Sequence, residues 1–325
     1  MPTPIRWGIL GPGHIAEKFA EALNHTGGVL LEAVASRDPE RAAAFAGKFG
    51  GCRYHADYIS LAEDPSVDVI YIATPHGFHL EHALLCLERG KPLLIEKPMT
   101  LSWAGTSKLT GMALQKGLFV MEAMWTRFLP VIRTTERLIK EGEIGDLRMV
   151  LADFCFKGTS SREGRLYNMR LGGGSLLDVG VYPLSLFQLF LGNPEKILSC
   201  ARLADTGADE ICQALLQYPA ERSAQMISGI SFDSPVTATL VGSEGMIHIP
   251  SRWYRAGTLS LEHRGEGPRV ISCPIEFNGF EYQIREVTRC LKEGLVESPD
   301  WPHSMVMDRF KTMDRIREQC GISYD

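Results

Sequence analysis

The first 124 residues alternate short apolar runs with segments whose apolar positions recur at helical spacing. The run 68–74 fits a buried strand, whereas Ile15, Phe19 and Leu23 lie four residues apart, as on one face of a helix. Strands are expected at residues 7–10, 29–36, 68–74, 93–96 and 119–123. Helices are expected from residue 15 onward, at 39–49, within 55–62, and at 79–89 and 102–116. Strands that alternate with helices predict a parallel sheet covered on both faces.

The pattern changes near Leu147, where longer extended segments begin. They are expected at residues 147–156, 196–203, 211–218, 223–232, 236–241, 246–249, 258–262 and 270–274. Turn-rich separators between them favour an open, mainly antiparallel sheet. Two helical segments, 174–191 and 281–292, are expected to cover one of its faces, and a last helix is expected at 304–319.

The predicted fold class is therefore α/β followed by α+β. Residues 1–124 are expected to form an N-terminal Rossmann domain with a parallel sheet. Residues 125–325 are expected to form a C-terminal α+β domain with an open, predominantly antiparallel sheet.

Composition and charge narrow the class of protein. The chain has 325 residues, of which 45% are hydrophobic and 22% charged, and this length suits two globular domains. A formal net charge of −5 gives no reason to expect nucleic acid or an anionic membrane as a partner. No apolar run approaches the roughly 18 residues that span a bilayer, and no secretory signal is visible. A cytoplasmic location is expected.

A glycine-rich loop follows the first strand and opens the first helix. Residues 11–16, Gly-Pro-Gly-His-Ile-Ala, have the form G-x-G-x-x-A of the dinucleotide fingerprint, in the strand–turn–helix context that it requires. Gly11 allows the tight turn, Gly13 lets a pyrophosphate approach the backbone, and Ala16 keeps the helix close to the strand. The expected phosphate contacts are Gly11, Gly13, His14 and Ile15.

The end of the second strand predicts which dinucleotide binds. The usual acidic ligand of the NAD ribose is replaced by Ser36 and Arg37, a hydroxyl and a guanidinium that suit the 2′-phosphate of NADP. NADP is the predicted cofactor. The alternative is that Arg37 is an ordinary exposed side chain and that Asp38 binds the ribose of NAD.

Two further motifs follow the next strands, where open α/β sheets bind ligands. In Thr74-Pro75-His76-Gly77-Phe78-His79, the residues Thr74, Pro75 and His79 are expected to contact the cofactor. In Glu96-Lys97-Pro98, both Glu96 and Lys97 are expected at the same site, the alternative being an ordinary solvated lysine.

No metal site is expected. His76, His79 and His82 are spaced three apart, but His76 lies in a loop while the other two lie on a helix, with few carboxylates or thiols nearby. The eight cysteines form no C-x-x-C motif and are expected to be reduced thiols rather than a disulfide framework.

Together with Gly173-Gly174-x-x-x-Asp178-x-Gly180-x-Tyr182, these motifs resemble the glucose–fructose oxidoreductase / inositol dehydrogenase / MocA family. Within it, residues 122–128 and Tyr182 resemble dimeric dihydrodiol dehydrogenases, whose relatives include NADP-dependent D-xylose dehydrogenases. Inositol-type members have His at the position of Tyr182, which argues against an inositol substrate. The resemblance implies a cis peptide before Pro98 and a homodimer formed through the exposed face of the C-terminal sheet.

The resemblance also implies the catalytic roles. Tyr182 would be the acid/base for the substrate hydroxyl while hydride moves to or from the nicotinamide. Because a free phenol has a pKa of about 10, a nearby cation such as Lys97 would be needed to favour the phenolate. Asp178, four residues before Tyr182, would orient the substrate hydroxyl or Lys97.

Aromatic side chains are the candidates for a substrate pocket, expected at Trp125, Phe154, Tyr182, Trp253, Phe277 and Phe280, with Tyr254 in the same segment as Trp253. Such side chains suit an aromatic ring, but they also stack on sugars, and each is equally typical of a core. Arg127, Tyr167 and Arg170 are candidate hydrogen-bonding groups for a polyol.

The function hypothesis is NADP-dependent hydride transfer to or from a carbinol of a trans-dihydrodiol or a sugar, a small-molecule substrate. The alternatives are another sugar reductase, or a lyase that recycles its nicotinamide on the same scaffold, and a non-catalytic NADP-binding sensor.

Overall fold

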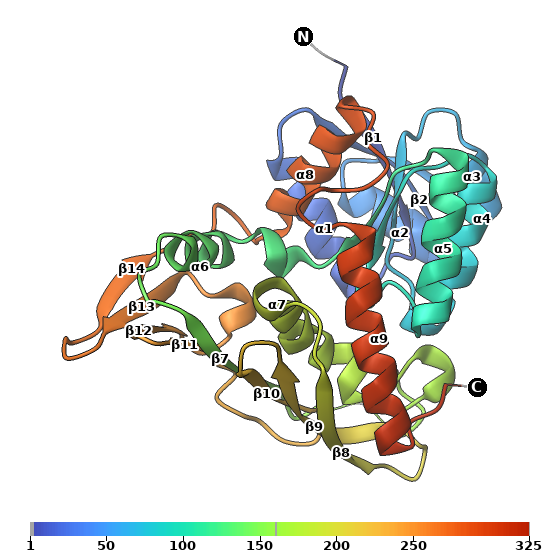
Figure 1. Ribbon diagram of the computed structural model, residues 1–325. Coiled ribbons are helices and arrows are strands. Elements are labelled where there is room, and N and C mark those ends of the chain that lie inside the picture. The colour runs from blue at the N-terminus through green and yellow to red at the C-terminus, as the bar shows by residue number, and fades with distance from the viewer. Residues whose placement is uncertain (1–2, 160, 325) are drawn as a thin grey trace. The chain divides into compact units, whose positions relative to one another are not determined.

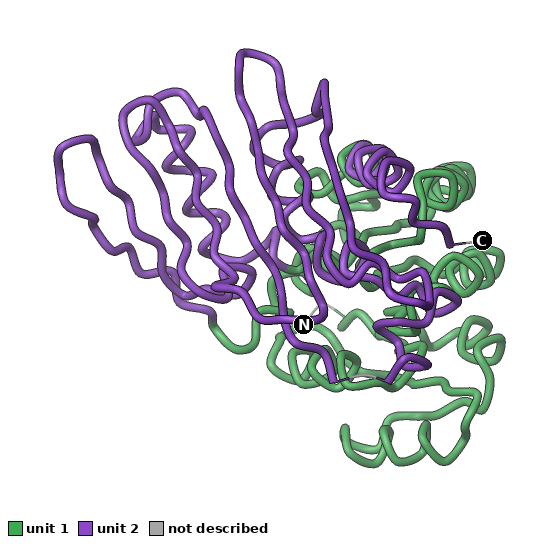
Figure 2. The backbone as a smooth tube through the Cα atoms, turned by 90° about the horizontal axis from the view of Figure 1, so that it is seen from below, with its two compact units in different colours: residues 1–125, 276–306 green, residues 126–275, 307–325 purple. Residues whose placement is uncertain are grey.

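The computed structural model describes residues 3–159 and 161–324, which form two compact units. The first unit comprises Met1–Trp125 and Glu276–Val306, and the second comprises Thr126–Ile275 and Met307–Asp325 (Figure 2). The division differs from the expected one, since the chain returns to the first unit at Glu276–Val306. What each unit binds stays a prediction.

The first unit contains a six-stranded sheet in the order β3-β2-β1-β4-β5-β6, with every neighbouring pair parallel. Its strands are β1 (Ile5–Leu10), β2 (Val29–Ala35), β3 (Arg53–His55), β4 (Val69–Ile72), β5 (Leu93–Glu96) and β6 (Val120–Ala123). The predicted parallel sheet is confirmed. Only β3 was not expected, because a three-residue edge strand with two exposed side chains carries almost no hydrophobic pattern.

Helices flank this sheet on both sides (Figure 1). They are α1 (His14–His25), α2 (Pro39–Lys48), α3 (Tyr58–Glu63), α4 (His79–Glu88), α5 (Trp103–Lys116) and α8 (Phe280–Lys292). Local sequence explains their ends: Ser102 accepts a hydrogen bond from the Gly105 N–H at the start of α5, and Gly117 ends that helix with a positive φ of 64°. Helices α3, α4 and α5 pack in succession, and α1 packs against α8.

The position of α8 corrects one expectation. The segment 281–292 was expected to cover the second sheet, but its helix packs in the first unit, where the ring centroid of Phe280 lies 6.4 Å from Phe19 and 5.1 Å from Trp125. The same returning segment brings Trp301, whose Nε1 donates to Glu122 at 3.2 Å. An amphipathic pattern shows that a helix buries one face, but not which surface it covers.

The second unit contains an eight-stranded sheet in the order β14-β13-β12-β11-β7-β10-β9-β8. Its strands are β7 (Leu147–Cys155), β8 (Lys196–Leu203), β9 (Asp209–Tyr218), β10 (Arg222–Gly229), β11 (Ala238–Gly242), β12 (Gly245–Ile249), β13 (Thr258–His263) and β14 (Arg269–Ser272). The β7–β10 pair is parallel and the other pairs are antiparallel, which confirms the predicted, predominantly antiparallel sheet.

The longest apolar helical stretch of the second unit lies against this sheet. A π-helical turn, Leu176–Gly180, leads into α7 (Val181–Leu191), which contacts β7 and β10. By length and composition alone the stretch Met169–Leu191 is apolar enough to cross a membrane, but 83% of its most apolar window is buried inside the protein, as in a core helix. A regular helix was expected from residue 174, so the π-helical turn is a correction.

Two other helices complete the description. Helix α6 (Pro130–Lys140) was not predicted, although its buried residues Val131, Ile132, Thr135 and Leu138 recur at helical spacing. Helix α9 (His303–Cys320) corresponds to the last predicted helix; its first residues belong to the first unit and the rest to the second.

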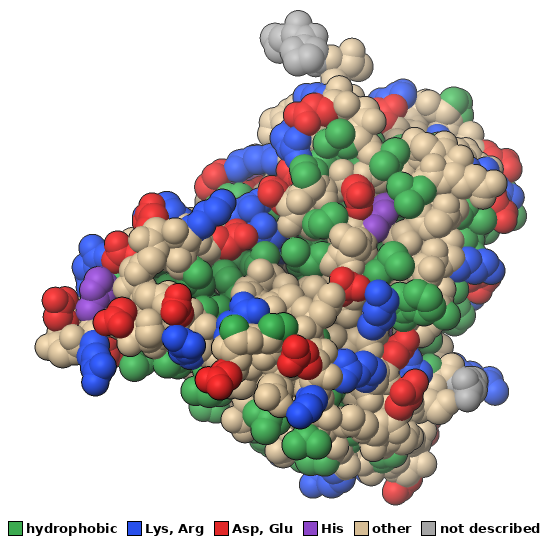
Figure 3. Space-filling model, viewed as in Figure 1, with side chains coloured by type: hydrophobic (Ala, Val, Ile, Leu, Met, Phe, Trp, Pro, Cys, Tyr) green, Lys and Arg blue, Asp and Glu red, His purple; other side chains and the backbone are tan. Residues whose placement is uncertain are grey.

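Positive and negative side chains are interspersed over the face that Figure 3 shows.

Candidate active site

The glycine loop after β1 has the geometry of a phosphate cradle. Gly11 has a positive φ of 96°, and a Cβ at this position would lie 2.9 Å from the Thr74 side chain after β4. Gly13 is the N-cap of α1, and a Cβ there would meet no heavy atom within 4 Å, so this side of the loop is open. No side chain caps α1, which leaves the N–H groups of its first turn to an anion. The loop therefore fits the pyrophosphate of a dinucleotide.

The loop lies at the point where the strand order reverses. Strands β1 and β4 are neighbours, whereas the chain runs from β1 to β2 on the other side. Doubly wound sheets bind nucleotides at this switch point, beyond the carboxyl ends of the strands. Gly11 and Thr74 follow these two strands and approach each other there, which places the two predicted contact segments together.

Asp38, the alternative ribose ligand, takes part in capping the helix that follows it. Its Oδ1 accepts hydrogen bonds from the Glu40 N–H at 3.1 Å and the Arg41 N–H at 3.3 Å, at the start of α2. The hydroxyl of Ser36 accepts from the Asp38 N–H at 3.1 Å. One carboxylate oxygen of Asp38 is thus used within its own turn, which weakens the case for it as the ligand of a ribose.

Two guanidinium groups lie near this end of β2. The exposed Arg37 lies over the Phe78 ring, 5.7 Å from its centroid. Arg41 donates from Nη2 to the carbonyl oxygen of Pro12 in the glycine loop at 3.4 Å. Sequence reasoning missed Arg41, although its place in the first turn of α2, four residues after Arg37, was a usable signal. Two cations at one strand end suit an anionic group.

His79 contacts the backbone of the loops after β4 and β5, where the nicotinamide of the cofactor is predicted to bind. Its ring is fully buried, with Nδ1 2.9 Å from the Pro98 carbonyl oxygen and Nε2 2.7 Å from the Thr74 carbonyl oxygen. Burial lowers the pKa of His79, although the two carbonyl contacts act in the opposite direction. His79 was expected to contact the cofactor; both of its ring nitrogens instead face the backbone of the loops after β4 and β5.

The neighbouring histidine His82 has a similar supporting contact. Its Nδ1 lies 3.0 Å from the Thr74 hydroxyl, and burial lowers the pKa of His82 to about 4.

Among residues 3–159 and 161–324, no group of three or more His, Cys, Asp or Glu side chains could hold a metal ion. All eight cysteines carry free thiols.

Lys97 follows β5 and is half-buried, and its peptide bond to Pro98 is cis, as the resemblance implied. The preceding carboxyl group, Glu96, is buried and accepts a hydrogen bond from the hydroxyl of Tyr71; it also accepts from the Lys97 N–H at 3.3 Å. Burial raises the pKa of Glu96 to about 7. Glu96 was expected to contact the cofactor, and its observed partners belong to the protein core.

In the second unit, Tyr182 lies at the start of α7, within a cluster of aromatic rings. Its ring centroid is 5.3 Å from that of Phe154 and 5.7 Å from that of Tyr254, and these two rings stack on each other at 4.4 Å. The backbone of Tyr254 is held by the Thr126 hydroxyl, which donates to its carbonyl oxygen at 2.9 Å. The cluster joins strand β7, the start of α7 and the short 3₁₀ turn Trp253–Arg255.

Asp178, on the π-helical turn, has a partner that the sequence did not reveal. Arg165 donates from Nη1 to Oδ1 at 2.9 Å and from Nη2 to Oδ2 at 3.2 Å. The Asp178 side chain is 8% exposed and that of Arg165 is 46% exposed. Attraction to Asp178, and secondarily to Tyr182, raises the pKa of Arg165. π-Helical turns within helices are frequent at functional sites.

The other predicted pocket residues are divided between the two units. Trp125 stacks on Phe280 at 5.1 Å, and Phe277 stacks on His25 at 3.7 Å, all in the first unit. In the second unit, Trp253 is 1% exposed and donates to the Asp153 carbonyl oxygen at 3.0 Å, which is a core contact. It is the next residue, Tyr254, whose ring accompanies Tyr182.

The three candidate polyol ligands are also dispersed within the second unit. Arg127 is buried and donates to Glu136 at 2.6 Å, and Tyr167 lies under Arg162, 4.9 Å from the ring centroid. Arg170 is exposed on a short 3₁₀ turn, Met169–Leu171. These contacts do not bring Arg127, Tyr167 and Arg170 together in one hydrogen-bonding site.

Comparison with known proteins finds matches along both predicted regions. The model of an oxidoreductase family with an NAD-binding Rossmann fold matches residues 5–124, and that of the GFO/IDH/MocA C-terminal domain matches residues 132–248. The trans-1,2-dihydrobenzene-1,2-diol dehydrogenases of Mus musculus and Sus scrofa are 35% and 36% identical over 328 and 332 residues. Both alignments cover 98% of this chain and 98% of the relative.

Solved structures share the fold. A 3-ketoreductase from Actinomadura kijaniata, in complex with NADP and TDP-benzene, matches with a TM-score of 0.89 and 26% identity over 98% of both chains. An aldose-aldose oxidoreductase from Caulobacter crescentus also has a TM-score of 0.89, at 21% identity over 98% of both chains. The switch-point geometry, the sheet order and these matches show that the chain is an NAD(P)-binding oxidoreductase of the glucose–fructose oxidoreductase / inositol dehydrogenase / MocA family.

Proposed function

We propose that this protein is an NADP-dependent dehydrogenase that transfers hydride between the nicotinamide and a carbinol of a trans-dihydrodiol or a sugar. The observation that carries the proposal is the position of Tyr182, whose ring lies among Phe154 and Tyr254 at the start of α7. A phenol in such surroundings combines an apolar binding surface with a group that exchanges a proton. The dihydrodiol dehydrogenases that the chain resembles support the carbinol substrate.

In the oxidative direction, Tyr182 as phenolate accepts the proton of the substrate hydroxyl, and the C–O bond becomes a carbonyl. Bound NADP would supply the acceptor for the hydride that leaves the same carbon. We assign to Lys97 the positive charge that favours the phenolate, following the family resemblance. In reduction the same phenol donates its proton to the carbonyl oxygen.

We propose NADP rather than NAD as the cofactor. Ser36 supplies a hydroxyl, and Arg37 and Arg41 supply two guanidinium groups near the end of β2. A 2′-phosphate binds such donors through charge-assisted hydrogen bonds, whereas a ribose hydroxyl does not need them. The NADP complex of the 3-ketoreductase supports the same choice.

Between the two substrate classes, the stacked pair Phe154 and Tyr254 favours a flat ring. The direct test follows the formation of reduced cofactor with trans-1,2-dihydrobenzene-1,2-diol and with D-xylose, for the wild type and Lys97→Met. We expect turnover of the diol, and a loss of about 10²–10⁴-fold in Lys97→Met. Substrate conversion without net reduced cofactor would indicate a lyase-type cycle instead, and unchanged turnover in Lys97→Met would contradict the role of Lys97.

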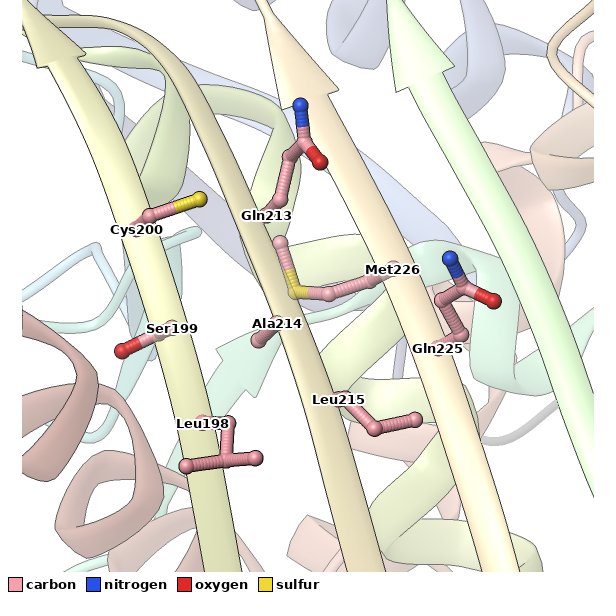
Figure 4. Close-up of a pocket in the computed structure, with 8 residues that line it drawn as sticks. All are labelled: Leu198, Ser199, Cys200, Gln213, Ala214, Leu215, Gln225 and Met226. Atoms are coloured by element: carbon pink, nitrogen blue, oxygen red, sulfur yellow. The ribbon is translucent and has the colours of Figure 1, made fainter.

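We also propose that the protein forms a homodimer through the exposed face of the second unit's sheet. Leu198 on β8 pairs across the strands with Leu215 on β9, and these side chains are 70% and 50% exposed. Figure 4 shows both leucines with Cys200, Gln213 and Gln225 along this part of the sheet. Neighbouring apolar side chains that the chain leaves exposed are typical of a protein interface.

Sedimentation of Leu215→Glu tests the dimer, because a buried charge at the interface opposes association. We expect a dimer for the wild type and a monomer for this variant. Leu114→Glu is the matched control, since Leu114 is 54% exposed on α5 of the first unit. A dimeric Leu215→Glu protein would place the interface elsewhere.

A further inference from the structure

Arg165 and Asp178 form an asymmetric ion pair in the second unit. The guanidinium is about half exposed, whereas the carboxylate that it reaches is almost fully buried. Two parallel hydrogen bonds, of 2.9 and 3.2 Å, join each nitrogen to a different carboxylate oxygen. This fork geometry fixes the plane of the carboxylate as well as its distance, which a lysine could not do.

We infer that Arg165 is a positioning residue for the proposed reaction: it keeps Asp178 ionised in one orientation and supplies positive charge beside Tyr182. The inference rests on the proposed acid/base function of Tyr182. Arg165 lies in a segment without regular structure, 13 residues before Asp178, and none of the sequence motifs includes it.

The first reason is the cost of burying Asp178. A buried carboxylate without a cation is destabilised in its charged form and tends to take up a proton. Tyr182 is proposed to exchange a proton with the substrate. A protonated Asp178 beside it would be a second group that gives up or takes up a proton there. Arg165 prevents it by pairing with both oxygens.

The second reason is the effect on Tyr182 itself. Asp178 precedes Tyr182 by four residues, and a negative charge at that distance disfavours a phenolate. The guanidinium compensates this charge. Attraction to Asp178 raises the pKa of Arg165, with a smaller contribution from Tyr182, so the same guanidinium favours a phenolate at Tyr182 as well. Both effects of Arg165 favour the reactive form of the tyrosine.

Within the second unit, other ionisable groups near Asp178 come from the end of the chain and from β9; Lys97 of the first unit is the cation already proposed to act on Tyr182. Burial, reinforced by the charges of Asp209 and Asp178, raises the pKa of Tyr324 far above its ordinary value, and its hydroxyl donates to the Gly173 carbonyl oxygen at 2.8 Å. Arg317 lies over the Tyr324 ring at 4.7 Å. Asp209 is fully buried, accepts from Ser175 and Leu176, and has its pKa raised to about 6 by burial.

Arg165 bonds directly to both carboxylate oxygens of Asp178. Tyr254, the titratable neighbour of Tyr182 on its other side, contributes a ring contact at 5.7 Å. These groups are unchanged in an Arg165 variant, so the effect of removing one guanidinium can be isolated. Burial raises the pKa of Asp209, and an Arg165 substitution leaves that burial in place, so Asp209 contributes equally to the profiles that are compared.

The test is the pH dependence of kcat/KM for oxidation of trans-1,2-dihydrobenzene-1,2-diol with NADP. In Arg165→Gln we expect the acidic limb of the profile to move up by about one pH unit, which is about a tenfold loss on that limb, with the curves converging at high pH. Arg165→Lys keeps the charge but not the fork, so its limb should move by about half as much. Ultraviolet titration of each variant, minus the same variant with Tyr182→Phe, reports the phenolate without turnover.

Arg162→Gln is the matched control, because Arg162 lies in the same segment and pairs with Glu210 at 3.3 Å instead. Its profile should superimpose on that of the wild type. An equal loss at every pH in Arg165→Gln would overturn the inference, because a merely structural ion pair does not move the limb. If Arg165→Gln does not fold, an unshifted limb in Arg165→Lys overturns it equally.

The outcome also separates this inference from the proposed function. Full turnover in Tyr182→Phe would contradict the proposed function itself. An inactive Tyr182→Phe together with an unshifted Arg165→Gln profile would contradict only the role of Arg165.

Discussion

Two buried carboxyl groups lie beside the residues proposed to do the chemistry, one in each unit, and their surroundings are opposite. Glu96 precedes Lys97 and accepts a hydrogen bond from the neutral hydroxyl of Tyr71; burial raises its pKa to about 7. Asp178 precedes Tyr182 by one turn and is held by the guanidinium of Arg165. The two buried carboxyl groups thus differ in their bonded partner, a hydroxyl for Glu96 and a guanidinium for Asp178.

The two carboxyl groups lie in regions that are held together differently. In the first unit, the carboxyl supports a backbone that is already fixed by neutral contacts, such as those of His79 with the Thr74 and Pro98 carbonyl oxygens. In the second unit, a permanent ion pair lies next to the proposed acid/base. We therefore expect changes in the first region to affect cofactor binding and stability, and changes in the second to affect the chemical step.

The sharpest way to break this comparison is Tyr182→Phe. Loss of the phenol should reduce kcat/KM by about 10²–10⁴-fold on every accepted substrate, because no general acid or base remains in its place. The affinity for NADP, measured by titration of the protein fluorescence, should stay within about twofold of the wild type, well below the tenfold change that 1.4 kcal/mol would give. A comparable loss of NADP affinity would mean that the two regions do not divide the work in this way.

The next largest effect is expected at the end of β2. Arg37→Ala and Arg41→Ala should each weaken NADP binding about 10–100-fold, the size of a lost hydrogen bond to a charged group, and leave NAD binding nearly unchanged. Titration with both dinucleotides measures the ratio. Lys108→Ala, an exposed position on α5, is the control. Equal losses for NAD and NADP would contradict the assignment of these arginines to the 2′-phosphate.

A smaller effect is expected from Tyr254→Leu, which removes the ring stacked on Phe154. A stacked aromatic contact contributes about 0.5–1.5 kcal/mol, so KM for the aromatic diol should rise about 2–10-fold while kcat changes little. KM for D-xylose should change less, because a sugar gains less from a flat ring. An equal rise in both KM values would argue against a subsite for an aromatic ring.

The first region was readable from the sequence because of how parallel sheets are built. The glycine loop, Ser36–Arg37 and Lys97 each follow a strand directly, and parallel strands end at one edge of their sheet. The order of these motifs along the chain therefore predicted that they lie close together in the fold. Arg41 could have been found by the same argument, since it lies one turn into the next helix.

The second region could not be read in the same way. Arg165 lies in an irregular segment, and Tyr254 follows Trp253 on a short 3₁₀ turn, so no periodicity relates either residue to Tyr182. Only the packing of β7, the π-helical turn and these loops brings the side chains together. Where the π-helical turn begins, Ser175 and Leu176 both donate to Asp209, which lies on β9 more than 30 residues away.

The smallest expected effect concerns stability and tests the other half of the comparison. Because burial raises the pKa of Glu96 from its ordinary value of 4.5 to about 7, the native protein binds more protons than the unfolded chain between these values. Stability contributed by the protonated form is complete below the unfolded value and is lost as pH rises toward 7. Glu96→Gln removes this titration but keeps an acceptor for Tyr71, so its melting temperature should fall less over this interval, by a few degrees. The control is Glu63→Gln, at an exposed carboxyl on α3, whose melting temperature should depend on pH as that of the wild type does. Parallel curves of melting temperature against pH for Glu96→Gln and the wild type would show that Glu96 stays charged throughout.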